Sequence, residues 1–207
     1  MAERILFDAW GDPPPRKISQ LVAALRRGEI VAYPTDTCFA LGCALGAKGA
    51  QETIANMRQL PRSQRLALLC ADVAMASKFA IFSETAFRLA QRLFPGPYTL
   101  VLPATKLVPR TLTEAKRKTV GIRVPAQAIV HAIIAELGEP LLTTTAMAPD
   151  AEAPCADADD VLEAFPHGID LVVDAARTAG ELSTVLSIEG DEVVVLRQGA
   201  GEIDDLI

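Results

Sequence analysis

Hydroxyl-bearing side chains follow a short apolar run near the N-terminus, at a point where the chain is expected to leave a strand. The run ends at Pro34, and Thr35 and Thr37 then flank Asp36. Because proline cannot donate a ladder hydrogen bond, we predict a strand over residues 29–33 that ends at this proline. Open α/β sheets tend to hold ligands at the carboxyl ends of their strands. The stretch therefore predicts one wall of a binding site.

Four later segments repeat this arrangement, each with hydroxyls or an arginine at the end of a strand-like run. They are Arg123 before Val124-Pro125, Thr143-Thr144-Thr145, Ser183-Thr184 before Val185, and Arg197 before Gln198-Gly199. An arginine fork binds carboxylate or phosphate through two hydrogen bonds, and hydroxyls with backbone amides complete an anion cradle. In any one segment the alternative is an arginine that caps a loop and threonines that merely favour a strand. Five such segments together favour an anion-binding site.

Other kinds of active site have little support in the sequence. It contains no GxGxxG opening a helix, no P-loop and no GxSxG nucleophile elbow. His131 is expected inside a helix and His167 in a turn, and neither has a partner at metal-ligand spacing. The four cysteines form no CxxC pair, so we expect buried, inert thiols and no metal site, with Cys38 singled out by its place after Thr37. Catalysis, if present, would rest on positioning and electrostatics.

Composition limits the partners and the compartment. The 207 residues are half hydrophobic and carry a net charge of −6, which predicts one well-filled domain and argues against indiscriminate nucleic-acid binding. No apolar run is long enough to cross a membrane and the N-terminus lacks the apolar core of a signal peptide, so a cytoplasmic protein is expected. Residues 104–123 nevertheless hold six basic residues against one acidic residue. Lys116, Arg117 and Lys118 could bind RNA, or could simply form a solvated surface.

The elements that must position these side chains follow from short apolar runs bounded by Gly, Pro or Asp. We predict strands over residues 30–33, 66–70, 99–103, 119–124, 141–145, 170–174, 184–188 and 193–197. Helices are predicted over residues 19–27, 50–59, 83–94 and 126–137, with Ser83 as an N-cap and with Gly28 and Gly138 closing two of them. Strands that alternate with helices early and follow one another late indicate an α/β fold with one mixed sheet flanked by helices.

The order of the motifs resembles the YrdC/YciO family. PTDTCFALG at 34–42 is similar to the family's PT(E/D)TxYGLG, and FPGPYTLVL at 94–102 is similar to its WPGPxTxVL. GIRVP at 121–125, STV at 183–185 and VLRQG at 195–199 match its later landmarks in the same order. Together the matches extend from about residue 20 to 201. The resemblance implies a YrdC/RibB-like single domain over residues 1–207, with its core at about 15–201, in which a twisted, mixed open sheet surrounds a basic cleft.

The resemblance also implies an activity and a set of ligands. Members of the family include threonylcarbamoyl-AMP synthases, which join L-threonine, bicarbonate and ATP for the threonylcarbamoyladenosine modification of tRNA. The family has also been described as binding double-stranded RNA. ATP or AMP would be the nucleotide, Mg²⁺ is allowed, and no protein-bound transition metal or membrane partner is implied.

Site residues carry over from the family motifs to this sequence by position. Arg123 and Ser183 would hold the threonine carboxylate and Arg197 the nucleotide phosphate, with Phe39 where a tyrosine is usual. No catalytic residue is assigned. The full set of implied binding residues is Thr35, Thr37, Phe39, Arg58, Arg123, Thr143, Thr145, Ser183, Thr184 and Arg197.

Two departures from the synthase pattern affect the nucleotide side. Synthases carry the motif Lys-x-Arg-Pro, and this chain has Arg58 in place of the lysine and Leu60 in place of the arginine. Synthases also carry the motif Pro-Ser-Ala-Asn, and this chain has Thr145 in place of the serine and Met147 in place of the asparagine. Losing a cation and an amide should cost several kcal/mol at a triphosphate site. The pattern is similar to the YciO branch. We therefore expect a weak or altered synthase, or a hydrolytic relative. The alternative is a non-catalytic module that binds double-stranded RNA or tRNA.

Overall fold

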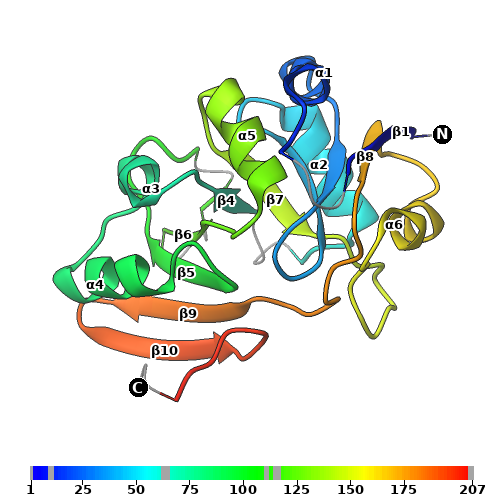
Figure 1. Ribbon diagram of the computed structural model, residues 1–207. Coiled ribbons are helices and arrows are strands. Elements are labelled where there is room, and N and C mark those ends of the chain that lie inside the picture. The colour runs from blue at the N-terminus through cyan, green and yellow to red at the C-terminus, as the bar shows by residue number, and fades with distance from the viewer. Residues whose placement is uncertain (1, 9–11, 62–65, 110–111, 114–117, 205–207) are drawn as a thin grey trace.

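The computed structural model describes residues 2–8, 12–61, 66–109, 112–113 and 118–204. The strands in this part of the chain are β1 Glu3–Leu6, β2 Val31–Pro34, β3 Phe39–Ala44, β4 Ala67–Leu69, β5 Tyr98–Pro103, β6 Thr119–Arg123, β7 Leu141–Thr145, β8 Leu171–Asp174, β9 Thr184–Glu189 and β10 Glu192–Arg197. They form one sheet in the order β1-β8-β2-β3-β7-β4-β6-β5-β9-β10 (Figure 1). Four neighbouring pairs are parallel (β1/β8, β2/β8, β4/β6 and β5/β9) and five are antiparallel, so the predicted mixed sheet is confirmed.

Helices cover the two faces of this sheet unequally. Helices α2 Lys48–Met57, α3 Val73–Phe79, α4 Glu84–Leu93 and α6 Ala158–Ala164 contribute to one core cluster, which also contains Leu68, Leu100 and Ile122 from the central strands. Helices α1 Pro15–Arg26 and α5 Ala128–Leu137 form a second core cluster with β1, β2, β7 and β8. Among the described residues, this second cluster includes none from β5, β6, β9 or β10. One face of that half of the sheet is therefore left without a helix.

The observed elements agree closely with the predicted ones. Each of the eight predicted strands is present with ends that differ by at most one residue, and the four predicted helices are α1, α2, α4 and α5. The Ser83 side chain accepts a hydrogen bond from Ala86 N, which confirms the N-cap of α4. Gly28 and Gly138 both adopt positive φ values after their helices, as a closing glycine does.

Four elements of the described structure were not predicted from the sequence, namely β1, β3, α3 and α6. Strand β3 is not among the predicted strands, and it contains Gly42, where a Cβ would lie 2.5 Å from the Tyr33 hydroxyl. This glycine marks a close approach between β3 and a buried tyrosine ring. Helices α3 and α6 have seven residues each, too few to show a helical period.

Candidate functional site

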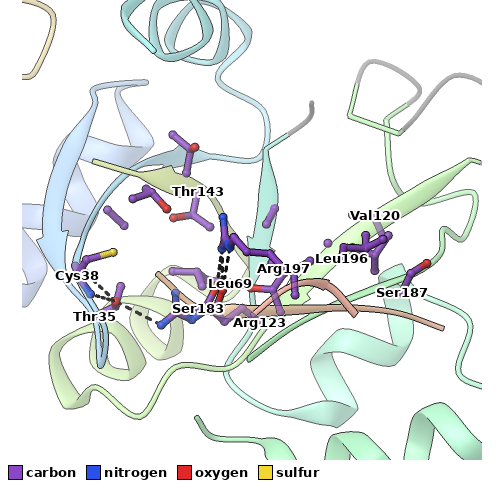
Figure 2. Close-up of a pocket in the computed structure, with 18 of the residues that line it drawn as sticks. Thr35, Cys38, Leu69, Val120, Arg123, Thr143, Ser183, Ser187, Leu196 and Arg197 are labelled. Atoms are coloured by element: carbon purple, nitrogen blue, oxygen red, sulfur yellow. Dashed lines mark hydrogen bonds between the residues drawn. The ribbon is translucent and has the colours of Figure 1, made fainter. Parts of the chain in front are cut away.

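A cavity of about 480 Å³ lies on the face that α1 and α5 leave open. Its lining comes from strands β3–β7, β9 and β10 (Figure 2). Strand alternation explains the lining: Thr99 and Gly121 face the cavity, while Leu100 and Ile122 beside them face the core. Small-molecule sites usually occupy about 300–1,000 Å³. The cavity therefore has the size of a ligand site.

Arg123, at the end of β6, is tied to the turn between β2 and β3. Its Nη2 donates to Asp36 Oδ1 at 2.6 Å, to Thr37 Oγ1 at 2.8 Å and to Thr35 Oγ1 at 3.4 Å. The turn is closed by Thr35, whose hydroxyl donates to the Cys38 carbonyl at 2.7 Å. The Arg123 and Asp36 side chains are only 10% and 11% exposed. The first arginine of the cavity is thus a buried cation with a carboxylate beside it.

Arg197, at the end of β10, is held at the start of β9. Its Nε and Nη2 donate to the Ser183 carbonyl at 3.0 and 2.8 Å, and Nη2 lies 3.2 Å from Ser183 Oγ. The Ser183 and Thr99 hydroxyls are hydrogen-bonded to each other at 3.0 Å. Burial lowers the pKa of Arg197, and the positive charge of Arg123 acts in the same direction. The two guanidinium groups therefore influence each other across one cavity.

Among the described residues at the cavity, positive charge exceeds negative charge. Arg123 has Asp36 as its ion-pair partner, whereas no carboxylate in the described part of the chain pairs with Arg197. Figure 2 shows Arg123, Arg197 and Ser183 between the Thr35–Cys38 turn and the Val120, Ser187 and Leu196 end. An anionic group would therefore find both charge and hydrogen-bond donors at the centre of the cavity.

Six of the ten predicted binding residues line this cavity, namely Thr35, Arg123, Thr143, Thr145, Ser183 and Arg197. Thr37 is fully buried and is not part of the lining, but its hydroxyl contacts the lining residues Arg123 and Thr35. Arg58 follows α2 and is half-buried but is not part of the lining. Burial lowers the pKa of Arg58, and its Nε has no hydrogen-bond partner among the described residues.

Two predicted binding residues have a different place in the structure. Phe39 was expected to line the cleft, but its ring is fully buried in the core cluster on the opposite face of the sheet. Thr184 is also fully buried, and its hydroxyl accepts hydrogen bonds from Gly199 N and Gly201 N. Both positions are therefore structural, because an inward-facing position on a strand cannot also face a ligand on the other side.

Several lining residues were not predicted, notably Thr99, Thr119, Gly121 and Ser187. Their signal in the sequence is a period of two. On β6, Thr119, Gly121 and Arg123 alternate with Val120 and Ile122, whereas on β5 Thr99 is the one polar residue among those that line the cavity. A strand with one apolar and one polar face has one side away from the core. Aligning those polar faces requires the strand order, which the sequence alone did not provide.

The basic run and the cysteines add little to the site. Lys116 and Arg117 lie outside the described residues, and Lys118 is exposed immediately before the cavity residue Thr119. Burial raises the pKa of the Cys38 thiol, although Arg123 and Arg197 oppose the shift.

No group of three or more His, Cys, Asp and Glu side chains within the described ranges is arranged to hold a metal ion. In the same part of the chain, no helix combines the length and the apolar character needed to span a membrane.

Comparison with known proteins defines the class. The profile of the Sua5/YciO/YrdC family, described as telomere recombination, matches residues 23–199. The chain therefore belongs to this family.

Within the family, the chain is similar to the uncharacterized protein YciO of Escherichia coli, with 38% identity over 93% of both chains. The crystal structure of that protein superimposes with a TM-score of 0.94 over 99% of this chain and 98% of the other, at 36% identity. The α/β fold and the similarity to the YciO branch are thus confirmed.

Synthases are more distant relatives. A threonylcarbamoyl-AMP synthase of Vibrio vulnificus is 35% identical over 62% of this chain and 70% of the synthase. The structure of Pyrococcus abyssi Sua5 complexed with L-threonine has a TM-score of 0.84 and 31% identity, over 94% of this chain and 57% of that one.

Proposed function

We propose that this protein binds an L-threonine-type carboxylate and a nucleotide phosphate in the cavity, and acts in threonylcarbamoyl-adenylate chemistry linked to tRNA modification. The observation that carries the proposal is that Arg123 and Arg197 line one cavity together with Ser183, which contacts Arg197. A relative of similar fold has been crystallised with L-threonine, and another is a threonylcarbamoyl-AMP synthase, which supports the choice of ligands.

The roles follow from the donors each residue has available. Arg123 and the Ser183 hydroxyl would hold the carboxylate, because both line the cavity, Arg123 at the end of β6 and Ser183 just before β9. Arg197 would hold a phosphate oxygen, since no carboxylate among the described residues offsets its charge. Fixed donors of this kind act by orienting reactants and by stabilising negative charge that develops during reaction.

The nucleotide side favours an altered reaction over efficient synthesis. Leu60, where synthases have an arginine, is partly buried and packs against the core cluster. Met147, where they have an asparagine, offers only a thioether, which is a weak acceptor. A triphosphate would therefore lose donors that the synthase pattern provides. We propose a weak synthase or a relative that hydrolyses a threonylcarbamoyl group, with water as the second reactant.

Ligand-induced stabilisation tests the binding step directly. Thermal unfolding is measured with AMP, ATP and L-threonine, separately and together, for the wild type, Arg197→Gln and the control Arg16→Gln, an exposed arginine on α1. A ligand that binds only the native state stabilises it by about 2.7 kcal/mol at a hundred times its Kd. Wild type and control should be stabilised alike, and Arg197→Gln should lose the nucleotide effect. Equal stabilisation of all three proteins would refute the assignment.

Activity assays then separate the reactions. Pyrophosphate release from ATP in the presence of L-threonine and bicarbonate would identify synthesis. Loss of the threonylcarbamoyl group from modified tRNA or from the adenylate, without pyrophosphate release, would identify hydrolysis. Absence of both reactions, together with binding of duplex RNA, would favour the RNA-binding alternative.

A further inference from the structure

Asp36 forms the ion pair with Arg123 through a single contact. Its Oδ1 accepts from Arg123 Nη2 at 2.6 Å, and both side chains are about nine-tenths buried. The other carboxylate oxygen, Oδ2, and the arginine Nε are also buried, and neither has a hydrogen-bond partner among the described residues. A side-on carboxylate–guanidinium fork would use both of these atoms. The pair is therefore only half formed.

The contact occupies one nitrogen of the Arg123 guanidinium and leaves another buried without a partner among the described residues. Nη2 is occupied by Asp36 and by the Thr37 hydroxyl, whereas Nε has no partner in the described part of the chain. Arg123 lines the cavity and Asp36 does not. The aspartate thus holds the guanidinium from the turn between β2 and β3 and occupies none of the cavity lining itself.

Asp36 also changes the charge balance between the two arginines. Arg123 and Arg197 are both partly or wholly buried on one cavity, and like charges repel strongly where little water screens them. The carboxylate at Arg123 offsets one of the two charges. An anion that enters between the arginines therefore meets their attraction together with repulsion from a resident carboxylate.

We propose that Asp36 is a positioning residue, which orients Arg123 for a bound anion and weakens anion binding by offsetting the charge of that arginine. The inference rests on the proposed function only in taking an anion as the ligand at Arg123. It goes beyond that function because it assigns Asp36 a share in both the geometry and the strength of binding. The expected consequence is a site that releases its anion readily.

Inorganic phosphate is the probe, titrated at constant ionic strength with wild type, Asp36→Asn and Asp36→Ala. Asparagine keeps an oxygen for Arg123 Nη2 but removes the charge. Phosphate should therefore bind Asp36→Asn about fivefold more tightly than wild type, a change typical of one screened charge at short range. Alanine removes the oxygen as well, so its affinity should fall below that of asparagine. Equal or weaker phosphate binding by Asp36→Asn, or no binding by either protein, would overturn the proposal.

Orientation of Arg123 has its own measurement, which needs no ligand. The ¹⁵N–¹H signal of Arg123 Nε, assigned by its loss in Arg123→Lys, should be sharp in wild type and in Asp36→Asn. In Asp36→Ala it should broaden, because the guanidinium can then rotate. An unchanged signal in Asp36→Ala would show that the aspartate does not orient the arginine. If the alanine variant fails to fold, Asp36→Ser, measured without sulfate or phosphate, provides the same comparison.

A double-mutant cycle separates this proposal from the proposed function. In an Arg123→Gln background, Asp36→Asn should raise phosphate affinity by less than it does in the wild type, because only the direct repulsion between carboxylate and anion is then removed. An undiminished effect would show that the aspartate does not act through the arginine. If L-threonine and AMP fail to stabilise the wild type while the phosphate pattern holds, the proposed function fails and the role of Asp36 stands.

Discussion

The hydroxyl of Thr184 holds the turn that follows β10, so replacing it with a methyl group measures the contribution of that turn. Thr184 is fully buried, and its Oγ1 accepts from Gly199 N at 2.9 Å and from Gly201 N at 3.0 Å. The same hydroxyl donates to Gly201 O at 2.7 Å. Valine has nearly the same shape, so Thr184→Val removes all of these bonds without opening a cavity.

The expected loss follows from the groups left unsatisfied. Gly201 is buried, so its N–H and C=O lose their side-chain partner without access to bulk water, whereas Gly199 is partly exposed and can bind solvent. Each buried group left without a partner costs about 1–3 kcal/mol. We therefore expect Thr184→Val to lower the free energy of unfolding by about 2–4 kcal/mol. The turn also carries the chain away from Arg197, so anion binding should weaken as well.

Urea unfolding followed by circular dichroism measures the change, with Thr184→Ser as the matched control. Serine keeps the hydroxyl and loses one methyl group, which costs about 1 kcal/mol. The valine variant must therefore be clearly less stable than the serine variant. If valine and serine destabilise equally, or if valine costs less than about 0.5 kcal/mol, the hydroxyl does not hold the turn as argued.

Three further predictions concern other parts of the molecule. Gly199→Ala should cost about 3 kcal/mol or more, since its Cβ would lie 2.1 Å from a backbone oxygen, whereas Gly49→Ala in α2 meets no atom within 4 Å and should be neutral or stabilising in the same urea assay. Burial raises the pKa of the Cys43 and Cys70 thiols to about 12. The contribution of these two thiols to stability should therefore be constant below about pH 8 and fall as pH rises above 9, where only the unfolded thiols ionise, by up to about 1.4 kcal/mol per pH unit and thiol. If stability falls just as steeply with pH after Cys43 and Cys70 are both replaced by alanine, the prediction is wrong. Finally, if the basic run at 116–118 binds duplex RNA, changing it to alanine should weaken binding and reduce its salt dependence, whereas salt-insensitive binding would argue against phosphate contacts.

Local patterns were sufficient for most of the secondary structure. Apolar runs bounded by Pro34, Pro103 or Asp174 end where the backbone must leave the sheet, so these strands could be located from sequence. Strand β3 was not predicted, and its Gly42 is explained only by the fold, because the Tyr33 ring on the neighbouring strand leaves no room for a side chain there. A packing constraint of this kind has no local signature.

The residues of the candidate site were likewise predictable from the sequence only in part. Residue types and motif order were enough to select Arg123, Ser183 and Arg197, because few side chains can bind an anion and these occur at strand ends. They were not enough to distinguish Thr184 or Phe39 from true lining residues. Which face of a strand meets the cavity depends on the register and order of its neighbours.

The sequence by itself therefore determined most of the helices and strands, the family resemblance and the chemical character of the site. Only the tertiary structure decided that β5, β6, β9 and β10 leave one face uncovered, and that two arginines from distant segments meet there. It also decided that Asp36 offsets one arginine and that the described residues supply no carboxylate for the other. The physical reason is that hydrogen-bonding capacity belongs to each residue type, whereas charge balance and burial arise only when strands remote in sequence are paired.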